Sequence, residues 1–302
     1  MKIGLVGLGR MGLNMARRLA RGGVEVVGQD ASPVARAAAV AAEPKISGAD
    51  TVQSLVAALA PPRIVWLMVP AGDPTEAVLE ALYPRLDPGD LVVDGGNANY
   101  RDSMKRAAAL AERGIAFVDA GVSGGVWGLA NGYTLTLGGA PDAVSRVAPL
   151  ARVLAPAPDR GWLHCGPVGS GHFAKMVHNA IEYGMMQAYA EGFALLAAKK
   201  EFALDVGAIA SNWRHGSVIR SWLLDLAAEA LAARPDIAAI APVVHDSGEG
   251  RWAVQEAVEL GVPAPVTAAA LTMRFATQGA NDYPARLLAL LRNAFGGHAV
   301  ER

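Results

Sequence analysis

The sequence has little cysteine and little charge. Cys165 is the only cysteine among 302 residues, so an intrachain disulfide and a centre of several metal-bound thiolates are excluded. Charged residues make up 18% of the chain and the net charge is −1, so the basic surface that nucleic-acid binding needs is missing. Apolar stretches are broken by Arg, Asp or Pro well before the roughly 18 residues of a membrane span. We therefore expect a cytoplasmic protein with no nucleic-acid or membrane partner.

A glycine motif follows the first apolar segment. Residues 3–6 are typical of a short strand, and Gly7-Leu-Gly9-Arg10-Met11-Gly12 then opens a helix that extends to about residue 22. Gly7 permits a tight turn, Gly9 lets a pyrophosphate approach the backbone, and Gly12 lets the helix pack closely. A GxGxxG motif between a strand and a helix predicts a dinucleotide site. The expected cofactor contacts are Gly7, Gly9, Arg10, Met11 and Gly12.

An acidic residue ends the second expected strand, at residues 24–29. Asp30 lies 18 residues beyond Gly12, where a carboxylate accepts hydrogen bonds from a ribose 2′-hydroxyl and repels a 2′-phosphate. This position favours NAD over NADP. A turn or helix-capping Asp ahead of Pro33 is the other interpretation of the same residue.

Further apolar strands alternate with segments of helical composition, such as residues 74–82 and 103–113. This alternation predicts an α/β fold, with an N-terminal doubly wound Rossmann domain at residues 1–166. The additional strands are expected at residues 64–69, 91–94, 116–119, 134–137 and 162–165.

Three glycine-bearing turns follow these strands: Val69-Pro70-Ala71-Gly72, Asp94-Gly95-Gly96-Asn97 and Gly121-Val122-Ser123-Gly124-Gly125. Each alone could be only a turn. Because parallel strands end at one edge of a sheet, together they supply backbone N–H groups and small side chains along that edge. We expect a dinucleotide and a sugar acid to bind there.

The second half, residues 167–302, is expected to be an all-α domain for substrate binding and oligomerisation. The boundary falls near residues 156–169, where Pro and Gly cluster. Helices are expected at residues 170–200, 204–212, 221–233, 252–260, 265–275 and 283–295.

The first of these helices carries a polar stripe. At 100° per residue, Lys175, His178, Asn179 and Glu182 lie at roughly 0°, 300°, 40° and 340°, on one narrow face. A structural Lys–Glu ion pair is one interpretation. With a His and an Asn between them, a catalytic pair is the other, in which a Lys held away from water acts as a base and the Glu as an acid.

These motifs together resemble the 6-phosphogluconate dehydrogenases, decarboxylating members of the 3-hydroxyacid dehydrogenase superfamily, and in particular their shorter NAD-preferring branch. The resemblance covers nearly the whole chain. Its most specific parts are Lys175-x-x-His178-Asn179-x-x-Glu182-Tyr183 and Arg292-Asn-Ala-Phe-Gly-Gly-His298.

The resemblance implies a role for each matching residue. Lys175 and Glu182 would be base and acid, and Asn97 would contact both nicotinamide and substrate. The cofactor would also touch Val69, Pro70 and Ala71. The remaining implied substrate contacts are Ser123, Gly124, Gly125, His178, Asn179, Tyr183, Arg274, Arg292 and His298. Arg292 and His298 would reach the phosphate from a neighbouring subunit of a homodimer or homotetramer.

The chain departs from the family pattern at two places. NADP-using relatives have Asn-Arg-Thr where this chain has Asp30-Ala31-Ser32. Longer relatives carry a phosphate-binding Lys in the loop that corresponds to residues 246–252, and this chain has none there, although Arg251 could substitute.

The implied activity is oxidative decarboxylation of 6-phosphogluconate, a phosphorylated sugar acid, to ribulose 5-phosphate and CO2 with NAD. The six histidines and the carboxylates show no metal-ligand spacing such as HxxxH, so no metal is expected. Two alternatives stay open: a non-decarboxylating 3-hydroxyacid dehydrogenase or imine reductase of the same superfamily, and a catalytically silent NAD-binding protein.

Overall fold

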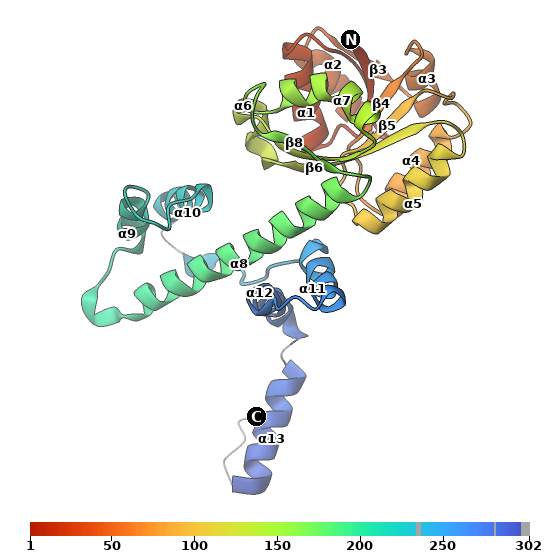
Figure 1. The fold of residues 1–302 in the computed structure, drawn as a ribbon. Coiled ribbons are helices and arrows are strands. Elements are labelled where there is room, and N and C mark those ends of the chain that lie inside the picture. Colours follow the sequence, from red (N-terminus) through yellow and green to blue (C-terminus); the bar gives the residue numbers. More distant parts are fainter. Residues whose placement is uncertain (234–236, 281, 297–302) are drawn as a thin grey trace. The chain divides into compact units, whose positions relative to one another are not determined.

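The computed structural model describes residues 1–233, 237–280 and 282–296 (Figure 1). The chain divides into two compact units, Met1–Met176 and Val177–Arg302, and each is described by itself. The long helix α8 (Ser170–Ala198) contributes to both units. The domain boundary at residues 166 and 167 stays a prediction.

The first unit is built on one eight-stranded sheet, in the order β3-β2-β1-β4-β5-β6-β7-β8. All neighbouring strands are parallel except β6 and β7. The predicted doubly wound α/β fold is confirmed. The strands are β1 (Lys2–Val6), β2 (Glu25–Gln29), β3 (Ile46–Ala49), β4 (Ile64–Leu67), β5 (Leu91–Asp94), β6 (Ala116–Ser123), β7 (Thr134–Gly139) and β8 (Trp162–Gly166).

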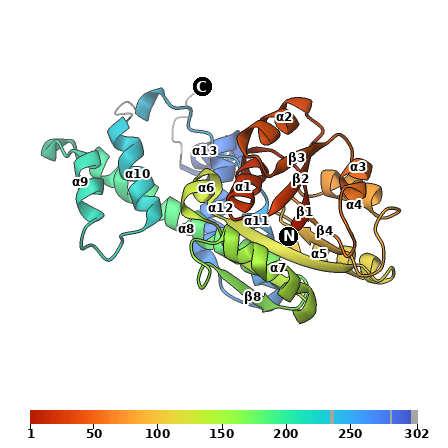
Figure 2. The same cartoon turned by 90° about the horizontal axis from the view of Figure 1, so that it is seen from above.

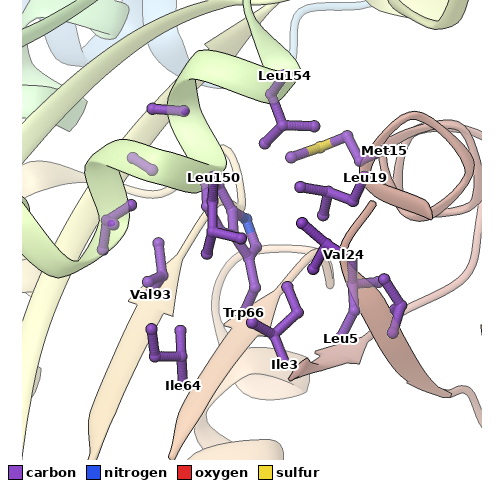
Figure 3. Packing of buried hydrophobic residues seen from close by; sticks show 14 of the residues in the cluster. Ile3, Leu5, Met15, Leu19, Val24, Ile64, Trp66, Val93, Leu150 and Leu154 are labelled. Atoms are coloured by element: carbon purple, nitrogen blue, oxygen red, sulfur yellow. The ribbon is translucent and has the colours of Figure 1, made fainter. Parts of the chain in front are cut away.

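Helices cover both faces of this sheet, because its strands alternate apolar residues between two clusters. Ile3, Leu5 and Trp66 pack with α1 and α7, as Figure 3 shows, whereas Val65 and Leu67 pack with α3, α4 and α5. The helices are α1 (Arg10–Arg21), α2 (Pro33–Ala42), α3 (Val52–Ala57), α4 (Asp73–Leu82), α5 (Tyr100–Ala111), the short η1 (Gly125–Trp127) and α6 (Gly128–Asn131), and α7 (Pro141–Leu154).

Several helices begin where the sequence supplies a cap. The Ser32 hydroxyl accepts a hydrogen bond from the Ala35 N–H at the start of α2, and Thr51 forms a capping box with Ser54 at the start of α3. A proline stands in the first two positions of α2, α4, α7 and α12 (Pro265–Phe275), where no intrahelical N–H bond is lost.

The second unit is helical. Figure 2 shows α9 beside α10, and their contact is made by Ala210, Leu224 and Ala228. Tyr183 of α8 packs against Ala270 and Leu271 of α12. In the described ranges, no helix is both long and apolar enough to span a membrane. Besides α8 and α12, the elements are η2 (Lys200–Phe202), α9 (Val206–Trp213), α10 (Trp222–Ala233), η3 (Ile237–Ala239), α11 (Glu249–Leu260), η4 (Ala276–Ala280) and α13 (Asp282–Gly296).

Candidate active site

The glycine loop between β1 and α1 has the expected close packing. Gly7 has φ +94°, and a Cβ there would lie 2.5 Å from the Met68 carbonyl oxygen. A Cβ on Gly12 would lie 1.9 Å from the Gly7 oxygen, so Gly12 lets α1 start directly on this turn. A Cβ on Gly9 would meet no protein atom within 4 Å, and its φ of −62° is ordinary. The protein itself therefore does not require glycine at position 9, whereas a closely bound ligand would.

Asp30 is tied to the same loop. Its carboxylate accepts hydrogen bonds from the Leu8 N–H at 2.7 Å and from the Ser32 N–H at 2.8 Å. The side chain thus fixes the glycine loop as well as ending β2. Each carboxylate oxygen has two lone pairs, so acceptor capacity for a sugar hydroxyl is left.

The loops after β4 and β5 pack on each other. The buried Thr75 hydroxyl donates to the Pro70 carbonyl at 2.8 Å and so holds the Val69–Ala71 turn. A Cβ on Gly96 would lie 2.8 Å from the Val69 carbonyl oxygen, so only glycine permits this approach. Because β2, β1, β4 and β5 are parallel neighbours, Asp30, the glycine loop, the Val69–Ala71 turn and Asn97 lie along one edge of the sheet.

A buried ion pair supports the loop that carries Asn97. Asp94 is fully buried, accepts the Gly96 N–H at 3.0 Å and pairs with Arg106 of α5 at 2.9 Å. Arg106 also reaches Glu76 at 2.7 Å. The buried Asp94 carboxylate needs the Arg106 guanidinium, since an unpaired buried charge is strongly destabilising.

The end of β6 lies against the start of α8. A Cβ on Gly121 would lie 2.4 Å from the Cβ of Lys175, so the strand backbone contacts the predicted base. Ser123 follows on the same face of β6, because strand side chains alternate. Gly124 and Gly125 have φ values of +133° and +53°, which favour glycine. Within the first unit, the predicted base and the predicted Ser123–Gly125 substrate turn are therefore close together.

In the second unit, α8 carries the rest of the polar stripe. The Nδ1 atom of His178 lies 3.2 Å from the amide oxygen of Asn179 and 3.9 Å from the Glu182 carboxylate. The side chains of His178 and Glu182 are 48% and 41% exposed. A catalytic acid paired with Lys175 would be held away from water, whereas the Glu182 side chain is partly exposed.

Three predicted phosphate ligands meet within the second unit. The Arg274 guanidinium lies 3.4 Å from the ring centroid of Tyr183 and donates to the His245 carbonyl at 3.0 Å. Arg251 stacks on Phe275 at 4.3 Å and pairs with Asp246 at 2.6 Å.

The Tyr183 side chain extends from α8 to the loop that precedes α11. Its hydroxyl accepts a hydrogen bond there from the Ser247 N–H at 3.3 Å. The hydrogen bond from Arg251 holds the pKa of the Asp246 carboxyl below its usual value. This group of side chains, with Arg251 on an open hollow beside Gln278 and Gly279, has the positive charge that an anion site needs.

Arg292 is exposed on the last turns of α13, and His298 lies outside the described residues. Their role in a neighbouring subunit stays a prediction, as do the roles of the other site residues.

Two buried groups near the site were missed by sequence reasoning. Arg106 is one, and the other is Asp119 on β6, which accepts N–H groups from Gly169, directly before α8, and from His172 in its first turn. A signal for Asp119 was present: it stands two residues before Gly121 and four before Ser123, on the same face of one strand.

Comparison with known proteins agrees with this geometry. Residues 2–162 match the family model of the NAD-binding domain of 6-phosphogluconate dehydrogenase, and residues 171–286 match the model of its C-terminal domain. A relative from Haloferax volcanii, named NAD(+)-dependent, decarboxylating 6-phosphogluconate dehydrogenase, is 43% identical over 100% of this chain and 99% of its own length. The chain belongs to the 6-phosphogluconate dehydrogenase family.

Two further relatives show how the chain stands within the family. A putative 6-phosphogluconate dehydrogenase of Bacillus subtilis is 41% identical over the full length of both proteins. The solved structure of Plasmodium falciparum 6-phosphogluconate dehydrogenase has a TM-score of 0.84 at 26% identity. This chain is matched over 100% of its length and covers 66% of the Plasmodium chain. It therefore has the family fold in a shorter form.

Proposed function

We propose that the chain catalyses oxidative decarboxylation of 6-phosphogluconate to ribulose 5-phosphate and CO2, with hydride transfer to NAD. The observation that carries this proposal is the stripe on α8, where Lys175 packs on β6 at Gly121 and His178 lies beside both Asn179 and Glu182. The family models match on both sides of this stripe, and a full-length relative bears the name of this activity.

The residues of the glycine loop fit NAD. The open space around Gly9 suits a pyrophosphate, and Asp30 suits an unmodified ribose. Arg10, Met11, Val69, Pro70 and Ala71 would line the same cofactor. When bound, NAD supplies the hydride acceptor. Ala31 stands where NADP-using relatives carry an arginine, and the nearby Arg36 guanidinium is held by the Asp30 carbonyl at 2.8 Å and the Asp50 carboxylate at 2.9 Å.

Lys175 serves as base and then as acid. Neutral when substrate binds, its amine takes the proton of the C3 hydroxyl while hydride leaves C3, which gives a 3-keto acid. The resulting ammonium hydrogen-bonds to the new carbonyl oxygen and stabilises the negative charge that develops as the C1 carboxylate leaves as CO2. Glu182 then delivers a proton to the carbon that lost CO2, which forms C1 of ribulose 5-phosphate.

The substrate is held by groups at two ends. Ser123, Gly124 and Gly125 offer hydroxyl and backbone donors to the carboxylate end, and His178 and Asn179 are near its hydroxyls. Arg251 and Arg274 supply the positive charge for the phosphate, and Tyr183, whose ring lies under the Arg274 guanidinium, supplies a hydroxyl. In this account Arg251 takes the place of the lysine that longer relatives carry.

A second copy of this chain completes the site. Four leucines of α13 are between 42% and 60% exposed, apolar surface that a lone monomer would leave in water: Leu287, Leu288, Leu290 and Leu291. A homodimer or homotetramer covers it and brings Arg292 and His298 to a neighbour's phosphate. The single cysteine is consistent with activity in the cytoplasm.

A substrate comparison tests the proposal. Purified protein is given NAD and either 6-phosphogluconate, gluconate or 3-hydroxyisobutyrate, and NADH formation is followed at 340 nm. We expect turnover of 6-phosphogluconate at least about 100-fold above the other two, because the phosphate subsite is charged. Faster turnover of 3-hydroxyisobutyrate would favour the non-decarboxylating alternative. NADH binding without turnover of any substrate would favour the catalytically silent one.

A further inference from the structure

Asp119 is a fully buried carboxylate that the proposed mechanism does not use. It lies on β6, two residues before Gly121 and four before Ser123, and all three share one face of the strand. Its two oxygens accept the backbone N–H groups of Gly169 at 2.7 Å and His172 at 2.8 Å. Gly169 directly precedes α8 and His172 lies in its first turn, where N–H groups have no intrahelical partner.

The first turn of α8 packs directly against the backbone of β6 and β7. A Cβ on Gly171 would lie 2.5 Å from the Thr136 carbonyl oxygen and 2.6 Å from that of Asp119. A Cβ on Gly138 would lie 2.5 Å from the Asp119 carboxylate. The Thr136 hydroxyl also donates to the Gly171 carbonyl at 2.9 Å. Small residues on both sides therefore allow α8 to approach β6 and β7 closely enough for Asp119 to reach it.

A second contact fixes the rotation of this first turn. His172 is 1% exposed, and its Nδ1 atom lies 2.7 Å from the hydroxyl of Ser103 on α5. Burial raises the pKa of the Asp119 carboxyl above its usual value, and His172 and the two N–H groups offset this only in part.

We infer that Asp119 is a positioning residue for catalysis, which sets the place of Lys175 relative to Ser123 through the start of α8. Lys175 is one turn beyond His172, and its Cβ contacts β6 at Gly121. The same strand thus holds the helix through Asp119 and presents the substrate turn at Ser123. A shift of α8 by an ångström would misplace the amine against the C3 hydroxyl, and such errors cost about 100-fold in rate. This inference rests on the proposed function.

Asp119→Asn tests the inference, because the amide accepts one N–H and turns its own N–H toward the other. Asp90→Asn is a matched control. Asp90 is also fully buried, and its carboxylate also accepts two backbone N–H groups, from Arg63 at 2.6 Å and Asp87 at 3.0 Å, but it lies at the amino end of β5, where it also pairs with the Arg63 guanidinium at 2.9 Å. Both variants should unfold at a lower temperature than the wild type.

Only Asp119→Asn should lose catalysis. We expect its kcat to fall about 10- to 100-fold, with the Kd for NADH, measured by fluorescence, within about two-fold of wild type. The primary deuterium isotope effect on kcat with 3-deuterated 6-phosphogluconate should rise, because the misplaced base slows the hydride step. Asp90→Asn should keep the wild-type kcat and isotope effect.

Ser103→Ala provides a second variant if Asp119→Asn does not fold, with a smaller fall in kcat and the same rise in isotope effect. Wild-type kcat in Asp119→Asn, or in Ser103→Ala when the first is not folded, overturns the inference. Equal losses of kcat in Asp119→Asn and Asp90→Asn also overturn the inference. A wild type that does not turn over 6-phosphogluconate overturns the proposed function instead, so the two failures are distinct.

Discussion

We propose that the carboxylate of Asp30 discriminates NAD from NADP, and its contacts allow the effect to be estimated. It carries a charge at the end of β2 and accepts N–H groups from Leu8 and Ser32 at 2.7 and 2.8 Å. A dianionic 2′-phosphate beside this charge should cost at least about 2 kcal/mol, which is about 30-fold in kcat/KM. We expect a preference for NAD of at least that size.

Two substitutions separate the charge from the hydrogen bonds. Asp30→Asn removes the charge but keeps one acceptor oxygen, so the ratio of kcat/KM for NAD over NADP should fall by about 30-fold. Asp30→Ala also removes the acceptor for the Leu8 N–H of the glycine loop and the acceptor for the Ser32 N–H. This variant should have a smaller preference for NAD over NADP. It should also lower kcat/KM with both cofactors by about 5- to 150-fold, which corresponds to a loss of about 1–3 kcal/mol.

Initial rates with 6-phosphogluconate and each cofactor measure these effects. Glu25→Gln is the control, because Glu25 is an exposed carboxylate at the other end of β2 and should leave the ratio unchanged. Equal or higher kcat/KM with NADP in the wild type would refute the reasoning. So would an unchanged ratio in Asp30→Asn.

Three other perturbations test separate parts of the account. Lys175→Met should lower kcat by more than the roughly 10²- to 10⁴-fold typical of one general base, since the residue also assists decarboxylation; more than about a tenth of wild-type kcat would exclude it as base. Arg106→Met should lower the free energy of unfolding in urea by about 3–5 kcal/mol, because Asp94 stays buried without its partner; a change below about 1 kcal/mol would contradict this. Co-expression of Lys175→Ala with Arg292→Ala chains should recover about a quarter of wild-type sites if the C-terminal segment serves a neighbour; activity at the level of the parents would mean that it serves its own chain.

Local patterns predicted most of the first unit, because its strands and glycine turns are determined by short-range sequence. The spacing from Gly7 through Gly12 to Asp30 predicted both the turn and the acid that now lies against it. Strand β3 was missed. Only two residues of Ile46-Ser-Gly-Ala49 are buried, so the apolar pattern is too short to predict a strand.

The supporting contacts could not be predicted, because they join residues far apart in the sequence. Asp119 contacts a helix start 50 residues later, and nothing in its neighbours specifies that partner. Arg106 follows an ordinary helical pattern, yet its side chain crosses to the buried Asp94. On α8, periodicity predicted the shared face of the polar stripe but not its exposure, which depends on what covers the helix.

The ratio of CO2 to NADH is the measurement that tests the central claim most directly. 6-Phosphogluconate labelled at C1 is incubated with the protein and NAD, and released labelled CO2 and NADH are counted in the same sample. The account predicts one CO2 for each NADH and no label in the sugar phosphate product. NADH formed without CO2 would show that the chain oxidises its substrate without decarboxylation and would contradict the account.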